Sequence, residues 1–127
     1  MGQQQFLLIS LTVILVALMV AVSIAMFMDQ AAASNRDSLS NDLIGYASKA
    51  QEFYRHPTML GGGGGTFIGF DLGNDPKNAD GVFDITAVTP LSVDIEGVGI
   101  ELGYDEVNPV KLVIKVTADS IKVVEVN

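Results

Sequence analysis

The side chains best suited to chemistry are few and scattered in this chain of 127 residues. There is no Cys, which excludes disulfides, thiolate metal sites and thiol redox chemistry. The single His, His56, stands beside Arg55, and a lone His at a helix end caps the last carbonyls or faces water more often than it transfers protons. We therefore predict no catalytic residue, no enzymatic activity and no cofactor.

One oxygen-rich segment offers a candidate for a metal ion. Asp71, Asp75 and Asp80, together with Asn74 and Asn78, carry the carboxylate and amide oxygens that Ca²⁺ prefers. Their spacing departs from that of the twelve-residue calcium loop, and the distal Glu of that loop is missing. A solvated acidic loop is the favoured interpretation, so no metal site is predicted.

A run of five glycines, residues 61–65, is a second pattern that can bind ligands. A phosphate-binding loop needs a strand before it, and a Lys-Ser/Thr pair and a helix after it, none of which is found here. We interpret the run as a hinge between a helix and a sheet, because glycine backbone is flexible and has no side chain to pack. Nearby aromatic residues could form a ligand platform, but at a helix–sheet junction they usually belong to the core; they are Tyr46, Phe53, Tyr54, Phe67 and Phe70.

Charge divides the chain into two parts. The formal net charge of −8 argues against a nucleic-acid partner, yet residues 1–28 contain no ionisable side chain at all. The 23 residues from Phe6 to Met28 are interrupted only by Ser10, Thr12 and Ser23, and a helix of this length, about 35 Å, can cross a bilayer. A secretory signal would begin with basic residues, and a buried core helix would need a larger protein around it.

The helical pattern continues beyond Met28 in amphipathic form. Apolar residues recur at spacings of three and four, and no proline occurs before Pro57, so we predict one helix of about 50 residues. The side chains expected to pack on the sheet are Leu39, Leu43, Tyr46, Ala50 and Phe53. The residues expected on the other faces are Arg36, Asp37, Asn41, Asp42, Lys49 and Gln51.

After Thr66 apolar and polar residues alternate, which indicates strands. The expected strands are 83–87, 91–96, 98–102, 110–117 and 121–123, and the apolar residues of each row are expected to face the helix. Breaks at Thr89-Pro90, Gly97, 103–109 and Ala118-Asp119 are of hairpin size, which favours antiparallel pairing. The predicted fold class is α+β, with one long N-terminal α-helix packed on a small, mostly antiparallel sheet.

Gly2 is followed by QQQFLLISLTVILVALMVAVSIAMF, then by the amphipathic helix and the small sheet. This arrangement resembles type IV pilin-like proteins that carry a class III signal. The resemblance implies that prepilin peptidase cuts after Gly2 and leaves Gln3 as the new N-terminus. Leu7 stands where the family usually has a glutamate that pairs with a neighbouring subunit, and Gln4, Gln5 and Ser10 offer neutral hydrogen bonds instead.

The resemblance also implies a division of labour along the chain. Residues 1–2 would be the leader, 3–28 a membrane anchor that becomes the filament core, 29–57 the amphipathic half of the same helix, and 58–127 the head. The chain would assemble with copies of itself into an extracellular helical filament on the cell surface, from a precursor in the cytoplasmic (inner) membrane, with an assembly ATPase and a platform protein as further partners. The predicted core residues are Phe6, Leu7, Leu8, Leu11, Ile14, Leu15, Leu18, Val22 and Phe27, with small residues at Ala17, Ala21, Ser23 and Ala25.

Two other functions fit the same sequence. The chain can be a single-pass membrane-anchored module that displays an acidic binding domain, with no polymer. It can also be a minor pilin, or a pseudopilin of a secretion system. The four Lys and eleven acidic residues in 56–127 give the head region its negative charge in every case.

Overall fold

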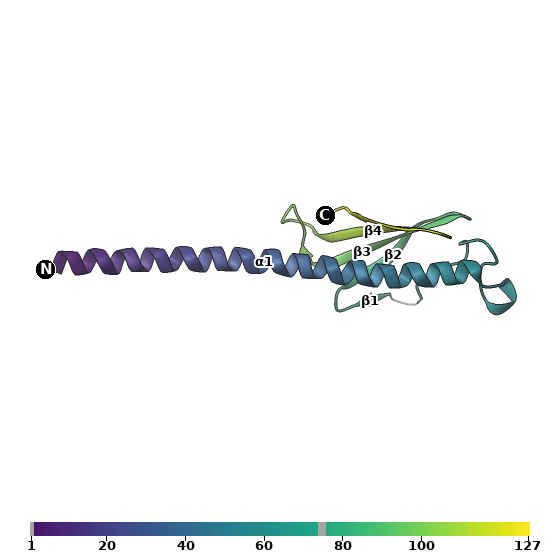
Figure 1. Ribbon diagram of the computed structural model, residues 1–127, viewed down its shortest axis with the longest axis horizontal. Coiled ribbons are helices and arrows are strands. Elements are labelled where there is room, and N and C mark those ends of the chain that lie inside the picture. The colour runs from purple at the N-terminus through teal and green to yellow at the C-terminus, as the bar shows by residue number, and fades with distance from the viewer. Residues whose placement is uncertain (1, 74–75) are drawn as a thin grey trace. The chain divides into compact units, whose positions relative to one another are not determined.

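The computed structural model describes residues 2–73 and 76–127 and contains one long helix followed by a small sheet (Figure 1). The helix α1 spans Gly2–Arg55, and a short 3₁₀ turn follows at Thr58–Leu60. The strands are β1 (Lys77–Asn78), β2 (Gly81–Val88), β3 (Ser92–Leu102), β4 (Pro109–Thr117) and β5 (Ile121–Glu125). The predicted α+β class, with a helix packed on an antiparallel sheet, is confirmed.

The chain divides into two compact units, residues 1–31 and 32–127. The first unit is the apolar part of α1, and the second contains the rest of α1 and all the strands. With 54 residues, α1 is close to the predicted length of about 50, and it ends at Arg55, two residues before Pro57.

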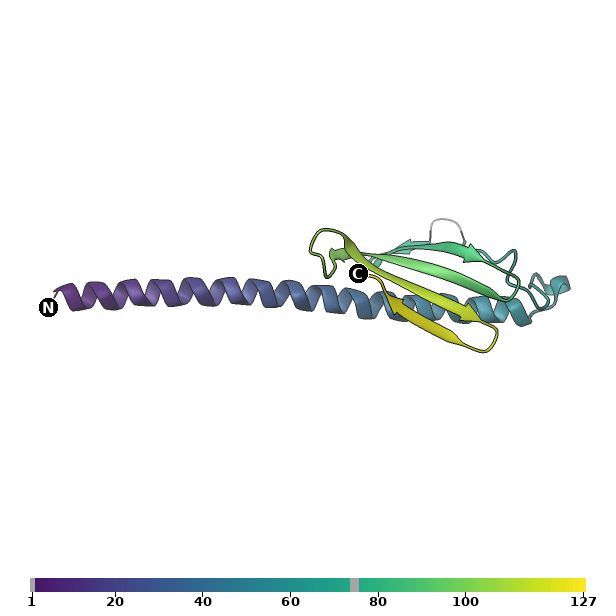
Figure 2. The same cartoon turned by 90° about the horizontal axis from the view of Figure 1, so that it is seen from above.

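The sheet has the strand order β1-β2-β3-β4-β5, and every neighbouring pair is antiparallel. Short hairpin loops connect the strands from β2 to β5, which is why neighbours in sequence are neighbours in space. Ile95 lies opposite both Ile85 and Ile114, and Ile114 lies opposite Val123. Directly opposed residues share a face, so these side chains form an apolar row on one face of the sheet. Figure 2 shows the strands lying along the second half of α1.

β3 runs without interruption from Ser92 to Leu102, so the break predicted at Gly97 is wrong. Alternation along this strand, started by the buried Val93 and Ile95, turns Gly97 and Gly99 toward the helix. The row formed by Val98, Ile100 and Leu102 therefore does not face the helix as expected, and Ile100 is 66% exposed. The glycines are there because α1 lies too close to β3 for a side chain, and Gly99 in particular would overlap Asn35 if it carried a Cβ.

Two further residues lie away from the core, contrary to expectation. The register of β2 shifts between Ile85 and Ala87, which places the exposed Ala87 opposite Asp94. Leu91 precedes the first residue of β3 and is 70% exposed. A bulge and a strand start are set by tertiary pairing, and the alternating pattern alone did not contain either.

The core lies between α1 and one face of the sheet. Helix residues spaced three or four apart are buried there, and the Tyr46 ring packs on that of Phe83 with centroids 5.0 Å apart. Alanines at three of these positions bring the helix backbone close to the strands. The fully buried members with the largest side chains are Leu39, Leu43, Phe67, Phe83, Val93, Ile95, Val110, Leu112, Ile114 and Val116.

Candidate functional site

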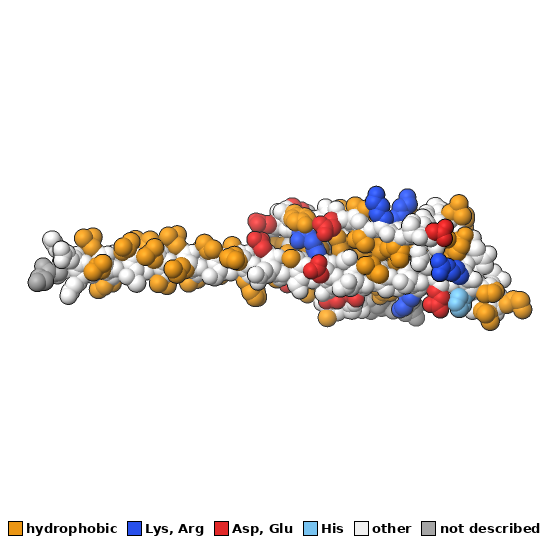
Figure 3. Space-filling model, viewed as in Figure 1, with side chains coloured by type: hydrophobic (Ala, Val, Ile, Leu, Met, Phe, Trp, Pro, Cys, Tyr) orange, Lys and Arg blue, Asp and Glu red, His pale blue; other side chains and the backbone are white. Residues whose placement is uncertain are grey.

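The apolar unit of α1 is the most unusual surface of the protein. Every residue from 2 to 30 is exposed, including 17 large apolar side chains between Phe6 and Met28, whose exposed fractions run from 48% at Leu15 to 76% at Phe6. On the face seen in Figure 3, apolar side chains run along this part of α1, and residues 6–28 contain no charged side chain. It is also long and apolar enough to cross a membrane, judged by length and composition.

The free energy of this exposure can be compared with the stability of a domain. Fully burying one such side chain contributes about 1.5–3 kcal/mol, so 17 side chains that are each about half exposed cost on the order of 20 kcal/mol in water. A typical domain is stable by about 5–15 kcal/mol in total. This unit therefore needs an apolar environment that the chain itself does not provide.

Two hydroxyl groups of this unit are hydrogen-bonded in a way that suits such an environment. The Thr12 hydroxyl donates to the Leu8 carbonyl at 2.8 Å, and the Ser23 hydroxyl donates to the Met19 carbonyl at 2.8 Å. Each hydroxyl is thus satisfied one turn back on its own helix. Burying these side chains in lipid or against another helix would leave neither hydroxyl proton without an acceptor.

The residues predicted to form the filament core all lie in this exposed unit. They are Phe6, Leu7, Leu8, Leu11, Ile14, Leu15, Leu18, Val22 and Phe27, and each is at least 48% exposed. Gly2 and Gln3, the predicted processing site, form the exposed start of α1. Cleavage between them stays a prediction.

The residues predicted to pack on the sheet lie in the second unit. Leu39, Leu43 and Ala50 are fully buried, Tyr46 is half-buried against Phe83, and Phe53 is half-buried with its ring 5.6 Å from that of Phe70. The Tyr54 and Phe67 rings are 4.8 Å apart. The aromatic side chains around the helix end therefore pack on one another.

Asn35 is a buried polar residue that sequence reasoning missed. Its amide nitrogen donates to the Asp80 carbonyl at 2.8 Å, and its Oδ1 accepts the amides of Ile100 and Glu101 at 3.1 and 3.3 Å. These bonds tie α1 to β3 and to the start of β2. The available signal was its place four residues before Leu39, on the same helix stripe.

Arg36 also lies differently from expectation. It was predicted on a polar face, but only 9% of it is exposed, because its guanidinium stacks 3.6 Å over the Tyr104 ring. Its Nη2 donates to the Asn127 carbonyl at 3.3 Å, while Nε has no hydrogen-bond partner among the described residues. A flat, delocalised cation tolerates such a site better than an ammonium group.

The glycine run forms a cap on α1 where a hinge was expected. The amides of Gly63 and Gly65 donate to the carbonyls of Phe53 and Tyr54 at 2.7 and 2.8 Å, and that of Gly64 donates to His56 at 2.9 Å. These bonds satisfy carbonyls that a helix end leaves open. The same amides are thus not directed at a phosphate.

The acidic segment is partly outside the described residues, since Asn74 and Asp75 are not described. Asp71 accepts the Gly73 amide, and Asn78 accepts the amides of Asp80 and Gly81. A side-chain hydrogen bond to Asp42, followed by burial and by the Asp42 charge, raises the pKa of Asp80. Within 2–73 and 76–127, no three His, Cys, Asp or Glu side chains are grouped to hold a metal ion.

The loop between β3 and β4 is closed by polar contacts. The Asp105 carboxylate accepts the backbone amides of Asn108 and Val107, both at 2.9 Å, and the Asn108 side-chain amide at 2.8 Å. Donation from Asn108 is the largest cause that holds the pKa of Asp105 well below its usual range. The Asn127 side chain binds the same loop through the Asn108 and Pro109 carbonyls at 3.1 Å.

Comparison of the chain with models of protein families, with curated proteins and with solved structures finds no match.

Proposed function

We propose that this chain is the structural subunit of an extracellular type IV pilus-like helical filament, held together by the apolar unit of α1. The observation that supports the proposal is the exposure of 17 large apolar side chains between Phe6 and Met28, a segment of that unit that contains no charged residue. A helix of this kind persists in two environments, a lipid bilayer or a bundle of its own copies. Assembly moves it from the first environment to the second.

Bundling is favoured by the distribution of residue sizes. Ala17, Ala21 and Ala25 recur every four residues, and small residues at this spacing allow helix backbones to approach closely. A contact that is repeated by a rotation that never closes gives an open helical polymer from one kind of subunit. The subunit itself then needs no active site, and an assembly ATPase and a platform protein in the membrane would supply the work.

The proposal is tested by placing a charge in the apolar unit. Val16→Asp is expected to abolish filament formation, because an ionised side chain at the centre of such a helix costs about 2.5–3.5 kcal/mol in a membrane and is unpaired in a packed bundle. Val107→Asp is the matched control, since Val107 is exposed in the β3–β4 loop and its replacement leaves α1 unchanged.

Polymer yield is measured by negative-stain microscopy of sheared cell-surface material, together with N-terminal sequencing of the subunit. Filaments built from a protein that begins at Gln3 are expected for the wild type and for Val107→Asp. Wild-type protein recovered only as a monomer from detergent-solubilised membranes would reject the filament and favour a membrane-anchored module. Normal filaments from Val16→Asp would reject the role of the apolar unit.

A further inference from the structure

The face of the sheet turned away from α1 carries its charges in two halves. We call this surface the outer face. Directly opposed residues of antiparallel strands project on the same side, so the strand register identifies its members. The acidic half lies on β2 and β3 and consists of Asp84, Asp94 and Glu96, whereas the basic half lies on β4 and β5 and consists of Lys111, Lys115 and Lys122. Lys77 on β1, opposite Val82, adds one further positive charge at the β1 edge of this face.

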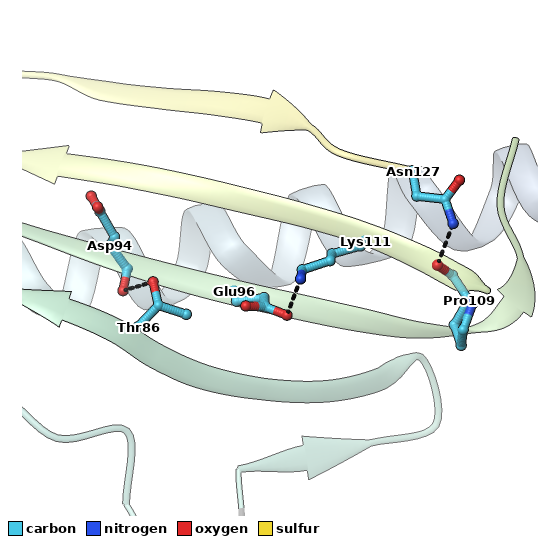
Figure 4. A network of polar contacts seen from close by, with 6 residues as sticks. All are labelled: Thr86, Asp94, Glu96, Pro109, Lys111 and Asn127. Carbon is cyan, nitrogen blue, oxygen red and sulfur yellow. Dashed lines mark hydrogen bonds and ion pairs between the residues drawn. The ribbon is translucent and has the colours of Figure 1, made fainter. Parts of the chain in front are cut away.

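The register aligns these residues in rows across the sheet. Asp94 lies opposite Lys115, and Lys115 lies opposite Lys122. Asp84 lies opposite Glu96. Figure 4 looks onto this face with α1 behind it, and shows the 3.1 Å ion pair between Glu96 and Lys111 at the boundary between the two halves.

Apolar side chains occupy much of the remaining outer face. Val82 lies opposite Val98, and Val113 lies opposite Val124, so two valine pairs stand among the charged residues. Val82 is 53% exposed and Val124 44%. A solvated sheet face is normally polar. Apolar groups between complementary charges are what a protein–protein interface contains.

We propose that the outer face binds the outer face of a second copy of this chain. A two-fold axis parallel to the strands, at the boundary between β3 and β4, would place the acidic half of each copy against the basic half of the other. Asp94 of one copy would then meet Lys115 of the other. A nucleic acid or an anionic membrane would meet carboxylates over half of this surface, so a second copy is the partner that satisfies both halves.

The size of the surface predicts a weak contact that gains strength by repetition. Strands β2 to β5, about 4.8 Å apart and on average about 27 Å long, present roughly 500 Å² per copy, or about 1,000 Å² in total. Stable complexes usually bury about 1,200–2,000 Å². On the proposed function, each filament displays many heads, so multivalent pairing of outer faces would join neighbouring filaments side by side.

Charge exchange tests the pairing on the full-length chain. One variant, Lys115→Glu with Lys122→Glu, makes the outer face mostly acidic. The other, Asp84→Lys with Asp94→Lys, makes it mostly basic. Self-association is measured by sedimentation velocity in micelles of an uncharged detergent. Each variant alone is expected to dimerise at least about tenfold more weakly than the wild type, and an equimolar mixture of the two is expected to recover dimers.

The control variant carries Lys49→Glu and Arg55→Glu on exposed positions of α1, which gives it the same net charge, −12, as the acidic variant (−8 minus two changes of 2). The control variant should dimerise like the wild type, except for a small effect of net charge. Dimers that form through the outer face should weaken at 0.5 M salt, because salt screens the charges. Unchanged dimerisation in both exchanged variants, or no recovery in their mixture, would overturn the proposal. Filaments that form but never bundle, from a chain that stays monomeric in micelles, would reject this pairing and leave the filament proposal standing. Dimers of the full-length chain without filaments would support the pairing of outer faces and reject the filament proposal.

Discussion

Replacing Gly99 by alanine should destabilise the sheet unit through a single contact with α1. A Cβ at this position would overlap Asn35 Oδ1 and would lie 3.0 Å from Leu39 Cδ1. Overpacking of this kind costs about 1–3 kcal/mol. Displacing the Asn35 amide also weakens its bonds to Ile100 and Glu101, by about 1 kcal/mol each. Replacing a glycine also lowers the conformational entropy of the unfolded chain, which stabilises the folded state by about 0.4–1 kcal/mol. The expected net loss in the free energy of unfolding is therefore about 2–4 kcal/mol.

A double-mutant cycle separates this clash from general disruption of β3. Asn35→Ala alone removes three hydrogen bonds and is expected to cost about 2–4 kcal/mol. In the double variant the overlap with Asn35 is gone and only the 3.0 Å approach to the flexible end of the Leu39 side chain remains, so adding Gly99→Ala should cost less than about 0.5 kcal/mol more. The coupling between the two sites is then about 1.5 kcal/mol or greater.

The assay is urea unfolding of the full-length chain in uncharged detergent micelles, followed by near-ultraviolet circular dichroism of the tyrosines. Tyr46 reports on the core because its ring packs on Phe83. Gly45→Ala is the matched control, because nothing lies within 4 Å of its added Cβ and alanine favours an exposed helix position by up to about 1 kcal/mol. Costs that simply add in the Gly99 and Asn35 double variant would refute the close approach of α1 to β3.

Two more predictions concern the glycine cap after α1 and the carboxyl pair formed by Asp42 and Asp80. Gly63→Ala should lower the free energy of unfolding by about 1–3 kcal/mol in the same urea assay, because the added Cβ would overlap the Thr66 carbonyl and lie 2.8 Å from Phe53 Cε1; wild-type stability would contradict the cap. Asp80→Asn should make the protein more stable at neutral pH: the raised pKa of Asp80 means that the wild type gains stability as pH falls through the folded pKa toward 3.8, and the variant lacks this gain. The two proteins should therefore converge in thermal melts below pH 3.8, and parallel pH profiles would contradict the carboxyl pair.

Local patterns were sufficient for much of the fold. The helix, its end before Pro57 and three hairpin loops depend on neighbours in sequence, so hydrophobic periodicity and turn residues predicted them. Gly97 was misinterpreted as a break because a glycine that makes room for a helix looks the same in sequence as one that ends a strand. Asn35 was missed because two of its partners, Ile100 and Glu101, are more than 60 residues away in the chain.

Of the two candidate functional surfaces, the sequence predicted one and missed the other. Composition alone located the apolar unit from Phe6 to Met28, since the signal is an uninterrupted run of apolar residues. The outer face was not found, because its two charged halves come together only when the register of four strands is known. Lys115 and Asp94 are 21 positions apart in sequence, yet they are directly opposed in the sheet.

The glycine cap changes how the low-complexity run at 61–65 should respond to insertions and deletions. A flexible linker tolerates the gain or loss of a residue at little cost, since loop entropy varies slowly with length. Here three successive amides, those of residues 63–65, each donate to a carbonyl at the end of α1 or just after it, and Phe67, two residues beyond the run, is fully buried. Losing one glycine would shift those amides out of phase and pull an aromatic anchor from its place. The length of this repeat should therefore be under as much constraint as the identity of a core side chain.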